Sequence, residues 1–156
     1  MATPFPFIAG AILTAGNLNS LFEAGTAFTP SLTGMTIGNG TQTHTYQQVN
    51  KLIVVHGFIT LGSTSTVTAD IEITLPVTGR NYGATTPVGT TYMFDSSSGV
   101  TFSGLVLMPS GSTSSVTLVT QQITSSYLAR GAISSTIPMT WAVSDQIRYQ
   151  YIVEVA

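Results

Sequence analysis

The two histidines, His44 and His56, are the residues of this sequence that could most readily exchange protons near neutral pH. A catalytic histidine needs a nucleophile and an acid that orients its ring, and a metal site needs about three converging ligands. No carboxylate lies close to either histidine in the sequence, and the chain has no cysteine. We therefore interpret both histidines as packing or interface residues, with a pH-sensitive contact as the alternative.

Carboxylates could do chemistry in two settings. Asp70 and Glu72 stand two residues apart in an alternating segment, so a strand places them side by side on one polar face. Such a pair could act as acid and base or hold a cation, but glycosidase carboxylates face each other across a cleft, and we favour a solvated face. Asp95 and Asp145 lie in predicted turns, where aspartate bonds its own backbone. A calcium site at these turns needs further oxygen ligands, which the sequence does not identify.

The glycine-rich stretch Gly38-Asn39-Gly40 could be interpreted as a phosphate loop. That chemistry requires a G-x-G-x-x-G pattern that opens a helix, whereas position 43 is threonine and another strand pattern follows. Asn-Gly between two strand patterns instead predicts a β-hairpin, with Asn39 and Gly40 at positive φ in a type I′ turn. No G-x-S-x-G serine motif occurs either. We expect a protein that is not an enzyme and that uses no catalytic residue, cofactor or metal.

Loop side chains are the remaining candidates for binding. Asn81 and Tyr82 follow a Thr-Gly-Arg stretch, and Tyr127 follows a pair of serines. Aromatic rings in strands usually belong to a core, but rings in loops are free to stack on a ligand. We keep Asn81, Tyr82 and Tyr127, with the serines at 96–98, as possible contacts for a surface glycan.

Charged residues make up only 6% of the 156 residues, against about 25% in typical soluble domains. The four basic residues are scattered along the chain, so no cationic stripe faces phosphates and we expect no nucleic-acid partner. The apolar start, MATPFPFIAGAIL, contains two prolines and falls short of the roughly 20 residues of a membrane span, so we expect no membrane partner. A surface so poor in charge predicts a coat of Ser and Thr, coverage by other subunits, or both.

Alternating apolar and polar residues predict an all-β fold from about residue 30 onward. The clearest strands are VTADIEITL at 67–75, which ends before a proline, and QIRYQYIVEV at 146–155. Further strands are predicted at about 33–38, 41–49, 90–95, 100–108, 115–122 and 136–144. Short strands separated by Gly, Pro, Ser and Thr are typical of an antiparallel β-sandwich, and we prefer jelly-roll-like connectivity within that class.

The segment KLIVVHGFITL at 51–61 differs from the other strands, because both of its faces are largely apolar. A strand buried on both sides needs two coverings, and a sandwich provides one of them through its opposite sheet. We infer that the second covering is a neighbouring subunit. The face predicted to lie between subunits consists of Leu52, Val54, His56 and Phe58.

The N-terminal segment, residues 1–27, is the one place where a helix is predicted. Thr14 could cap the start of this helix and Gly25 could end it. A helix of about ten residues is marginal in water and needs a surface to dock on. We expect an attachment segment here, ahead of a sandwich domain at 28–156; the alternative is a helix that caps its own sandwich. The predicted attachment residues are Leu13, Leu18, Leu21 and Phe22.

Two stretches resemble small virion proteins of tailed bacteriophages, of the tail-fibre, head-fibre and capsid-decoration kind. They are PFPFIAGAILTAGNLNSLFEAG and FTPSLTGMTIGNGTQTHTYQQVNKLIVVHGFITLGSTSTVTADIEITLPV. The first is similar to the short adaptor that opens many phage fibre-like proteins, and the second to the first half of their β-sandwich heads. Asn50 departs from this pattern, since such heads are expected to have glycine there.

The resemblance implies a non-enzymatic homotrimer that is located on the virion. Its N-terminus would attach to a capsid or tail protein, and its sandwich would decorate or stabilise the particle. The alternative is a receptor-binding fibre tip that recognises a host surface glycan. These motifs specify architecture and not activity.

Overall fold

The computed structural model describes residues 25–124 and 126–156, and every regular element in this part of the chain is a β-strand. All strand pairs are antiparallel, so the predicted all-β antiparallel class is confirmed. The strands are β1 (Thr26–Ala27), β2 (Leu32–Thr36), β3 (Thr41–Val49), β4 (Leu52–Thr60), β5 (Thr66–Thr74), β6 (Thr86–Phe94), β7 (Thr101–Met108), β8 (Ser115–Thr124), β9 (Tyr127–Gly131) and β10 (Gln146–Glu154).

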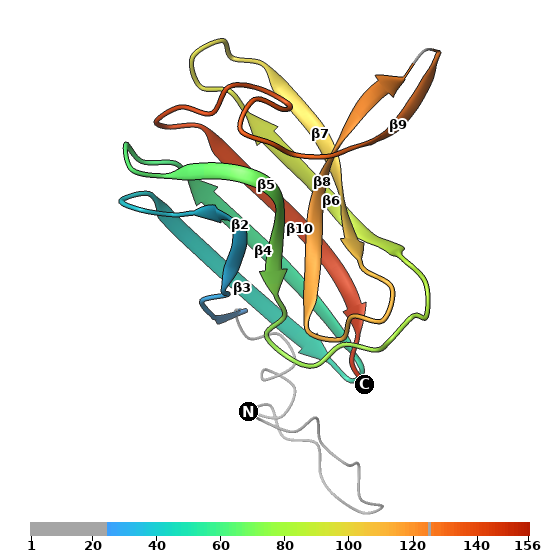
Figure 1. The fold of residues 1–156 in the computed structure, drawn as a ribbon. Helices are drawn as coiled ribbons and strands as arrows, with labels where there is room; N and C mark the ends of the chain where they lie inside the picture. The colour runs from blue at the N-terminus through green and yellow to red at the C-terminus, as the bar shows by residue number, and fades with distance from the viewer. Residues whose placement is uncertain (1–24, 125) are drawn as a thin grey trace, which may run out of the picture.

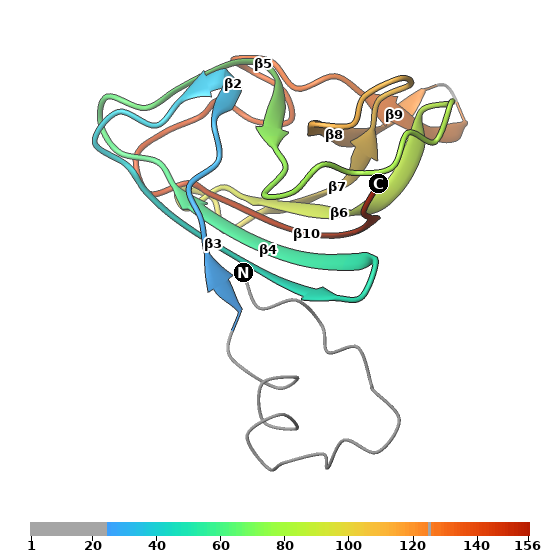
Figure 2. The ribbon, with the colours of Figure 1, turned by 90° about the horizontal axis from the view of Figure 1, so that it is seen from below.

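The ten strands form one continuous sheet in the order β1-β3-β4-β10-β6-β7-β8-β5-β2, with β9 paired to β8. This sheet curls into a half-barrel, so that β2 and β5 lie over β4, β10 and β6 (Figures 1 and 2). The β7–β8 pair carries the hydrogen-bond ladder around the bend between the two layers. The layers face each other as in a sandwich, but they are two halves of a single sheet.

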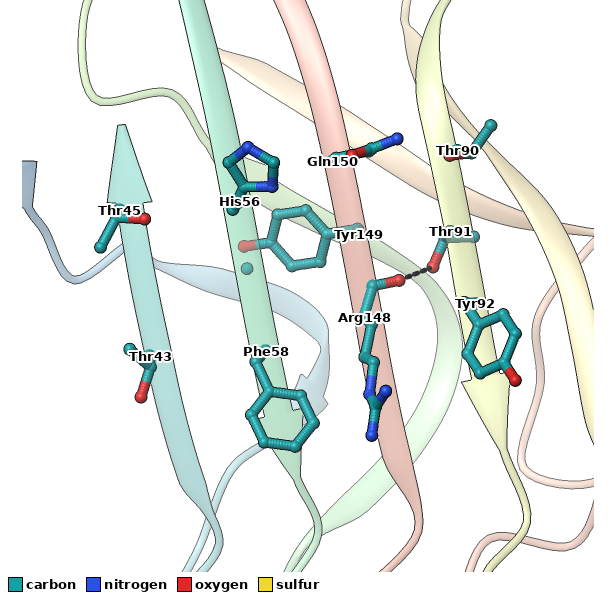
Figure 3. Close-up of a pocket in the computed structure, with 11 residues that line it drawn as sticks. Thr43, Thr45, His56, Phe58, Thr90, Thr91, Tyr92, Arg148, Tyr149 and Gln150 are labelled. Carbon is teal, nitrogen blue, oxygen red and sulfur yellow. Dashed lines mark hydrogen bonds between the residues drawn. The ribbon is translucent and has the colours of Figure 1, made fainter. Parts of the chain in front are cut away.

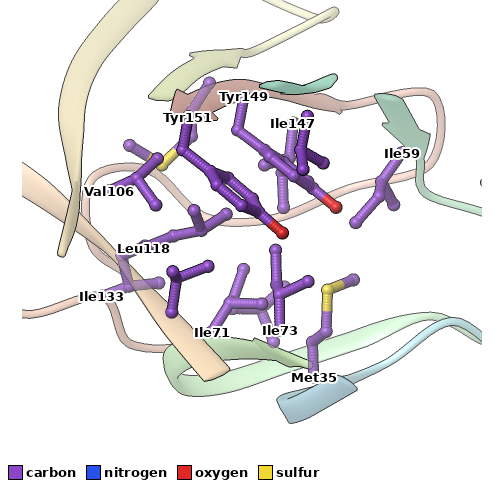
Figure 4. Packing of buried hydrophobic residues seen from close by; sticks show 14 of the residues in the cluster. Met35, Ile59, Ile71, Ile73, Val106, Leu118, Ile133, Ile147, Tyr149 and Tyr151 are labelled. Atoms are coloured by element: carbon purple, nitrogen blue, oxygen red, sulfur yellow. The ribbon is translucent and has the colours of Figure 1, made fainter. Parts of the chain in front are cut away.

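The hydrophobic core fills the space between the two layers. Alternate residues of each strand point inward, and Ile53 and Val55 of β4 and Ile71 of β5 have no exposed surface. Figure 4 shows side chains from both layers meeting in one cluster, with Ile71 on one side and Tyr149 and Tyr151 on the other. Because burial of one such side chain contributes about 1.5–3 kcal/mol, this cluster is the main source of stability.

A row that contains several glycines crosses the inner face of the sheet. Its residues are paired side by side in the order His44, Gly57, Tyr149, Thr91, Gly104, Thr120 and Gly131. The Tyr149 ring lies over Gly57, where a β-carbon would come within 2.0 Å of the ring's Cζ. At Gly104 a β-carbon would come within 2.6 Å of Thr91 Cγ2. The glycines leave room for their neighbours' side chains on the concave side, which allows the sheet to curl.

The stretch around Asn39 is a corner between the two layers, and the predicted hairpin is wrong. β2 pairs with β5, whereas β3 pairs with β1 and β4, so β2 and β3 are not partners. Positive φ occurs at Gly38 (55°) and not at Asn39 or Gly40. Asn39 Oδ1 accepts a hydrogen bond from Thr64 N at 2.9 Å, and Asn39 Nδ2 donates one to Ser63 Oγ at 2.9 Å. The Asn39 side chain thus ties this corner to the neighbouring corner between β4 and β5.

The predicted strand at 136–144 is also wrong, because this stretch is irregular. It belongs to the connection between β9 and β10, where Met139 is buried in the core. Trp141 Nε1 donates a hydrogen bond to the carbonyl oxygen of Ser134 at 2.9 Å. The apolar side chains of this loop cover the core without alternating across a strand. The strands β1 and β9 were not predicted.

Asp145 anchors the start of β10 to the turn between β6 and β7. Its side chain is fully buried, and its Oδ1 accepts hydrogen bonds from Ser96 N at 2.9 Å and from Ser96 Oγ at 3.1 Å. Its Oδ2 accepts a hydrogen bond from Ala142 N at 2.7 Å. The predicted role of Asp145 in its own turn therefore extends to a turn that lies far away in the sequence.

The turn between β6 and β7 is itself closed by Asp95, as predicted. Asp95 Oδ1 accepts hydrogen bonds from Ser97 N at 2.9 Å and from Ser98 N at 3.1 Å. The hydrogen bonds from these two serines lower the pKa of Asp95 to about 2. The carboxylate therefore stays ionised and bound to the turn under all ordinary conditions.

Candidate functional site

A groove of about 540 Å³ lies on the outer face of the sheet, over β3, β4, β10 and β6 (Figure 3). Strand alternation produces this face, because every second side chain of these strands points away from the core. The groove is lined by Thr43, Thr45, His56, Gly57, Phe58, Thr90, Thr91, Tyr92, Arg148, Tyr149 and Gln150. Its lining combines aromatic rings, hydroxyls and amides with a single arginine.

The four residues predicted to lie between subunits share the outer face of β4. Their inward neighbours on the strand are buried, while Leu52 is 50% exposed and Phe58 is 39% exposed. Ile152 of β10 pairs with Val54 and is 53% exposed, so the apolar surface continues onto the next strand. The described residues of the chain do not cover this face. Its burial by a sister copy stays a prediction.

Arg148 is the only charged residue of the groove. Its guanidinium carbon lies 5.1 Å from the centre of the Phe58 ring, and its Nη2 donates a hydrogen bond to Gln146 Oε1 at 2.6 Å. Stacking of this kind holds the guanidinium in place without neutralising it. The other two arginines pair with carboxylates, Arg80 with Glu154 and Arg130 with Asp70. Among the described arginines, Arg148 alone lacks a carboxylate partner.

The groove and the carboxylates of the described residues lie in separate places. His56 lines the groove, but no carboxylate does. Asp70 accepts hydrogen bonds from Ile133 N at 2.6 Å and from Arg130, and Glu72 accepts one from the Ser115 hydroxyl. The two carboxylates therefore hold neighbouring segments together. In the part of the chain that the structure describes, no group of three or more His, Cys, Asp or Glu residues is placed to share a metal ion.

The loop residues predicted to contact a glycan do not form one site. Tyr82 Oη accepts a hydrogen bond from Glu154 N at 3.0 Å, and Asn81 Oδ1 accepts one from Gly83 N at 2.8 Å, so both lie near the end of β10. The serines at 96–98 lie beside the residue that precedes the start of β10, at the opposite end of that strand. Tyr127 is 80% exposed on the β8–β9 hairpin, which projects from the body of the sheet (Figure 1).

His44 is buried on the inner face, as a packing role requires. Its Nδ1 lies 2.7 Å from the hydroxyl of Tyr149, and its Nε2 lies 2.9 Å from Gln42 Oε1. An amide oxygen only accepts hydrogen bonds, so Nε2 carries the proton and Nδ1 accepts one from Tyr149. Burial raises the pKa of the Tyr149 hydroxyl, which keeps this donor protonated. Burial also lowers the pKa of His44 to about 4, because a charged imidazole would lose its hydration.

Acidification is therefore expected to destabilise the fold between about pH 6.5 and pH 4. His44 has a pKa of about 4 in the folded chain and an ordinary value of 6.5 when unfolded, so the unfolded chain binds more protons in this range. The free energy of unfolding should fall by up to roughly 3 kcal/mol as the pH is lowered through this window. Urea unfolding at pH 7.5, 5 and 4 measures this fall in the free energy of unfolding. A His44→Phe variant should lose this dependence, and an equally steep dependence in that variant would contradict the assignment.

The predicted attachment residues Leu13, Leu18, Leu21 and Phe22 lie outside the described residues. The end of that segment is described: Thr26 and Ala27 pair with Tyr46 and Thr45 at the edge of the sheet. The chain therefore joins the sheet beside β3.

Comparison with known proteins adds no relative: no family, no curated protein and no solved structure matches this chain. Within the described residues, no helix is long and apolar enough to cross a membrane.

Several groove residues were not singled out from the sequence. Arg148, Gln150 and Tyr92 come from β10 and β6, which are far from β4 in the sequence but next to it in the sheet. One signal was available, since Ile152 is an apolar residue on the otherwise polar face of the last strand. Its position beside Val54 is what extends the apolar surface.

Proposed function

We propose that this protein is a non-enzymatic structural protein of a bacteriophage virion and that three copies associate through the outer face of β4 and β10. The observation that carries this proposal is the uncovered apolar surface formed by Leu52, Val54, Phe58 and Ile152. Subunit interfaces are depleted of charge at their centre, and this surface adjoins a groove with only one charged residue. The low charge of the whole chain supports the same conclusion.

The virion location is supported by the resemblance of the two sequence stretches to phage fibre and decoration proteins. Residues 1–27 would attach the trimer to a capsid or tail protein through Leu13, Leu18, Leu21 and Phe22. The curled antiparallel sheet is compatible with the sandwich heads of those proteins, and a jelly-roll-like kinship is part of the proposal. In this role the protein decorates or stabilises the particle.

Light scattering on the purified chain is expected to give three times the monomer mass at micromolar concentration. Val54→Lys should raise the dissociation constant at least 100-fold, because the change places an unpaired charge in the contact. Val143→Lys is the matched control, since Val143 is an exposed valine in the β9–β10 loop and does not line the groove, and it should leave the mass unchanged.

A monomeric wild-type chain would contradict the oligomer, and an unchanged mass for Val54→Lys would show that another face is used. Circular dichroism of each variant verifies that the sheet has formed. Cryo-electron microscopy of purified particles tests the virion location separately, and particles that lack density for the protein would contradict it.

The alternative of a glycan-binding fibre tip is less well supported. Its predicted contacts Asn81, Tyr82 and Tyr127 lie apart, and Asn81 and Tyr82 already bond to the backbone. The exposed Tyr127 by itself offers a sugar a single stacking surface.

A further inference from the structure

Two neighbouring rows of side chains cross the outer-face groove and give it two different walls. The strand register places Phe58, Arg148 and Tyr92 in one row and His56, Gln150 and Thr90 in the next. Figure 3 shows these side chains on β4, β10 and β6, with the Arg148 side chain between the two aromatic rings. Residues two apart on a strand are about 7 Å apart, and neighbouring strands are about 5 Å apart. Both rows can therefore contact one small molecule at the same time.

The aromatic wall presents a surface for stacking. The Phe58 ring is covered on one side by the Arg148 guanidinium, whose carbon lies 5.1 Å from the ring centre. The Tyr92 ring is 44% exposed, and its hydroxyl is tethered to Thr101 Oγ1 at 3.0 Å. A tethered, exposed ring holds an apolar surface at a fixed position. The C–H groups on one face of a sugar ring are a suitable partner for such a surface.

The polar wall consists of groups that both donate and accept hydrogen bonds. His56, Thr90 and Gln150 are all exposed on the outer face. An imidazole, a hydroxyl and an amide each combine a donor with an acceptor, as the hydroxyls of a sugar do. The groove volume of about 540 Å³ lies within the range of small-molecule sites. The lining thus matches a sugar in its hydroxyls as well as in its apolar face.

Arg148 gives the groove its only permanent charge, and its guanidinium is already held in place. Its Nη2 donates a hydrogen bond to Gln146 Oε1 at 2.6 Å, and no carboxylate of the described residues pairs with it. A guanidinium has five N–H donors in a planar fork, so a carboxylate can accept two parallel hydrogen bonds from it. A phosphate, with a charge of about −2, would need a second permanent cation, which the groove lining does not provide. The complementary ligand is therefore a carboxylate with a single negative charge.

We propose that the outer-face groove binds a sugar ring that carries a carboxylate, which is a uronic or sialic acid unit of an acidic glycan. The carboxylate pairs with the Arg148 guanidinium, the ring lies against Tyr92, and its hydroxyls bond to His56 and Gln150. The site is separate from the loop residues predicted to contact a glycan. It goes beyond the structural role proposed above and does not depend on the oligomer, because the apolar surface that includes Ile152 remains for a sister copy.

Calorimetric titration of the full-length protein with short acidic sugars tests this site. The probes are trigalacturonic acid and sialyllactose, and their neutral counterparts are the methyl ester of trigalacturonic acid and lactose. At least one acid should bind saturably with a Kd of about 1 mM or below, and at least tenfold more tightly than its neutral counterpart. The acid that binds more tightly distinguishes a uronic from a sialic acid site. No saturable binding of either acid, or equal affinity for an acid and its neutral counterpart, would overturn the proposal.

Substitutions locate the binding in the groove. Arg148→Gln should raise the Kd of the acid at least tenfold, and Arg148→Lys should restore part of the affinity because lysine keeps the charge but not the fork. Tyr92→Ala should raise the Kd at least fivefold, and Tyr92→Phe should restore it. Arg130→Gln is the matched control, since this exposed arginine does not line the groove, and it should leave the Kd unchanged. Arg148→Met is the second variant if Arg148→Gln does not fold, as judged by circular dichroism.

Three further outcomes would overturn the proposal. Unchanged affinity in Arg148→Gln would show that the acid binds elsewhere. Inorganic phosphate or an acidic tripeptide that binds as tightly as the acidic sugar would show that charge alone is recognised. Binding that appears only in Val54→Lys would show that a sister copy covers the groove. A wild-type chain that is monomeric by light scattering and still binds the acid would remove the proposed trimer and support this site.

Discussion

Replacing Gly57 with alanine is expected to lower the free energy of unfolding by about 3 kcal/mol, a large effect for a single methyl group. The added β-carbon would lie 2.0 Å from Cζ of Tyr149, so the tyrosine ring must leave its place over β4. When the ring moves, the hydrogen bond between the Tyr149 hydroxyl and His44 Nδ1 is lost as well. Both losses fall within the closely packed interior, where neighbours cannot relax freely.

Urea unfolding at a fixed protein concentration measures this effect, because association would make the apparent stability depend on concentration. Gly111→Asn is the control for glycine substitution, since Gly111 has a positive φ of 76° but open space around it. The double variant Gly57→Ala with Tyr149→Ala should be about as stable as Tyr149→Ala alone, because the clash is gone. A Gly57→Ala chain within about 0.5 kcal/mol of the wild type would show that the ring does not depend on this glycine.

Replacing Asp145 with alanine is expected to cost about 3 kcal/mol or more. The change removes the buried carboxylate that accepts part-buried hydrogen bonds from Ser96 N, Ser96 Oγ and Ala142 N, and a hydrogen bond to a charged group contributes about 1.5–3 kcal/mol. It also detaches the β6–β7 turn from the start of β10. Urea unfolding measures the loss, and amide hydrogen exchange should show reduced protection at Ser96 and Ala142.

Asp95→Ala is the matched control for this prediction. Asp95 also accepts hydrogen bonds from turn residues, but those bonds are exposed and water can replace them, whereas the bonds to the fully buried Asp145 carboxylate are part-buried. The loss of the Asp95 carboxylate should therefore cost less than about 1 kcal/mol. Equal destabilisation by the two substitutions would contradict the view that Asp145 acts as a buried anchor between distant segments.

Strands with a regular alternation could be predicted from the sequence. The segments that became β5 and β10 repeat apolar residues with period two, and the buried positions of the structure follow that repeat. The short β9, which pairs only with β8, carries no such repeat and was missed. The stretch at 136–144 is apolar but does not alternate, because its side chains reach the core from a loop.

The pairing of strands could not be predicted from local sequence. An Asn-Gly turn has the same residues whether the chain folds back on its own strand or crosses to the opposite layer. At Asn39 the outcome is decided by hydrogen bonds to Thr64 and Ser63, about 25 residues away. For the same reason the outer face was predicted only for β4. Its extension to Ile152 and Arg148 depends on β10 lying beside β4, which local patterns do not reveal.

The half-barrel is an open sheet, so its two end strands determine whether neighbouring copies can pair edge to edge. An open sheet edge exposes backbone groups that can recruit another chain without limit. Here one edge strand, β1, contributes only two residues, and the other, β2, is interrupted by a bulge between Thr33 and Met35. The bulge keeps the β2 edge from offering a long, flat template for lateral growth, whereas most of the opposite edge within the described residues is formed by β3, which pairs with β1 only at Thr45 and Tyr46. Neighbouring copies are thus kept from adding strands at the β2 edge, and the β3 edge is the one where another chain could pair.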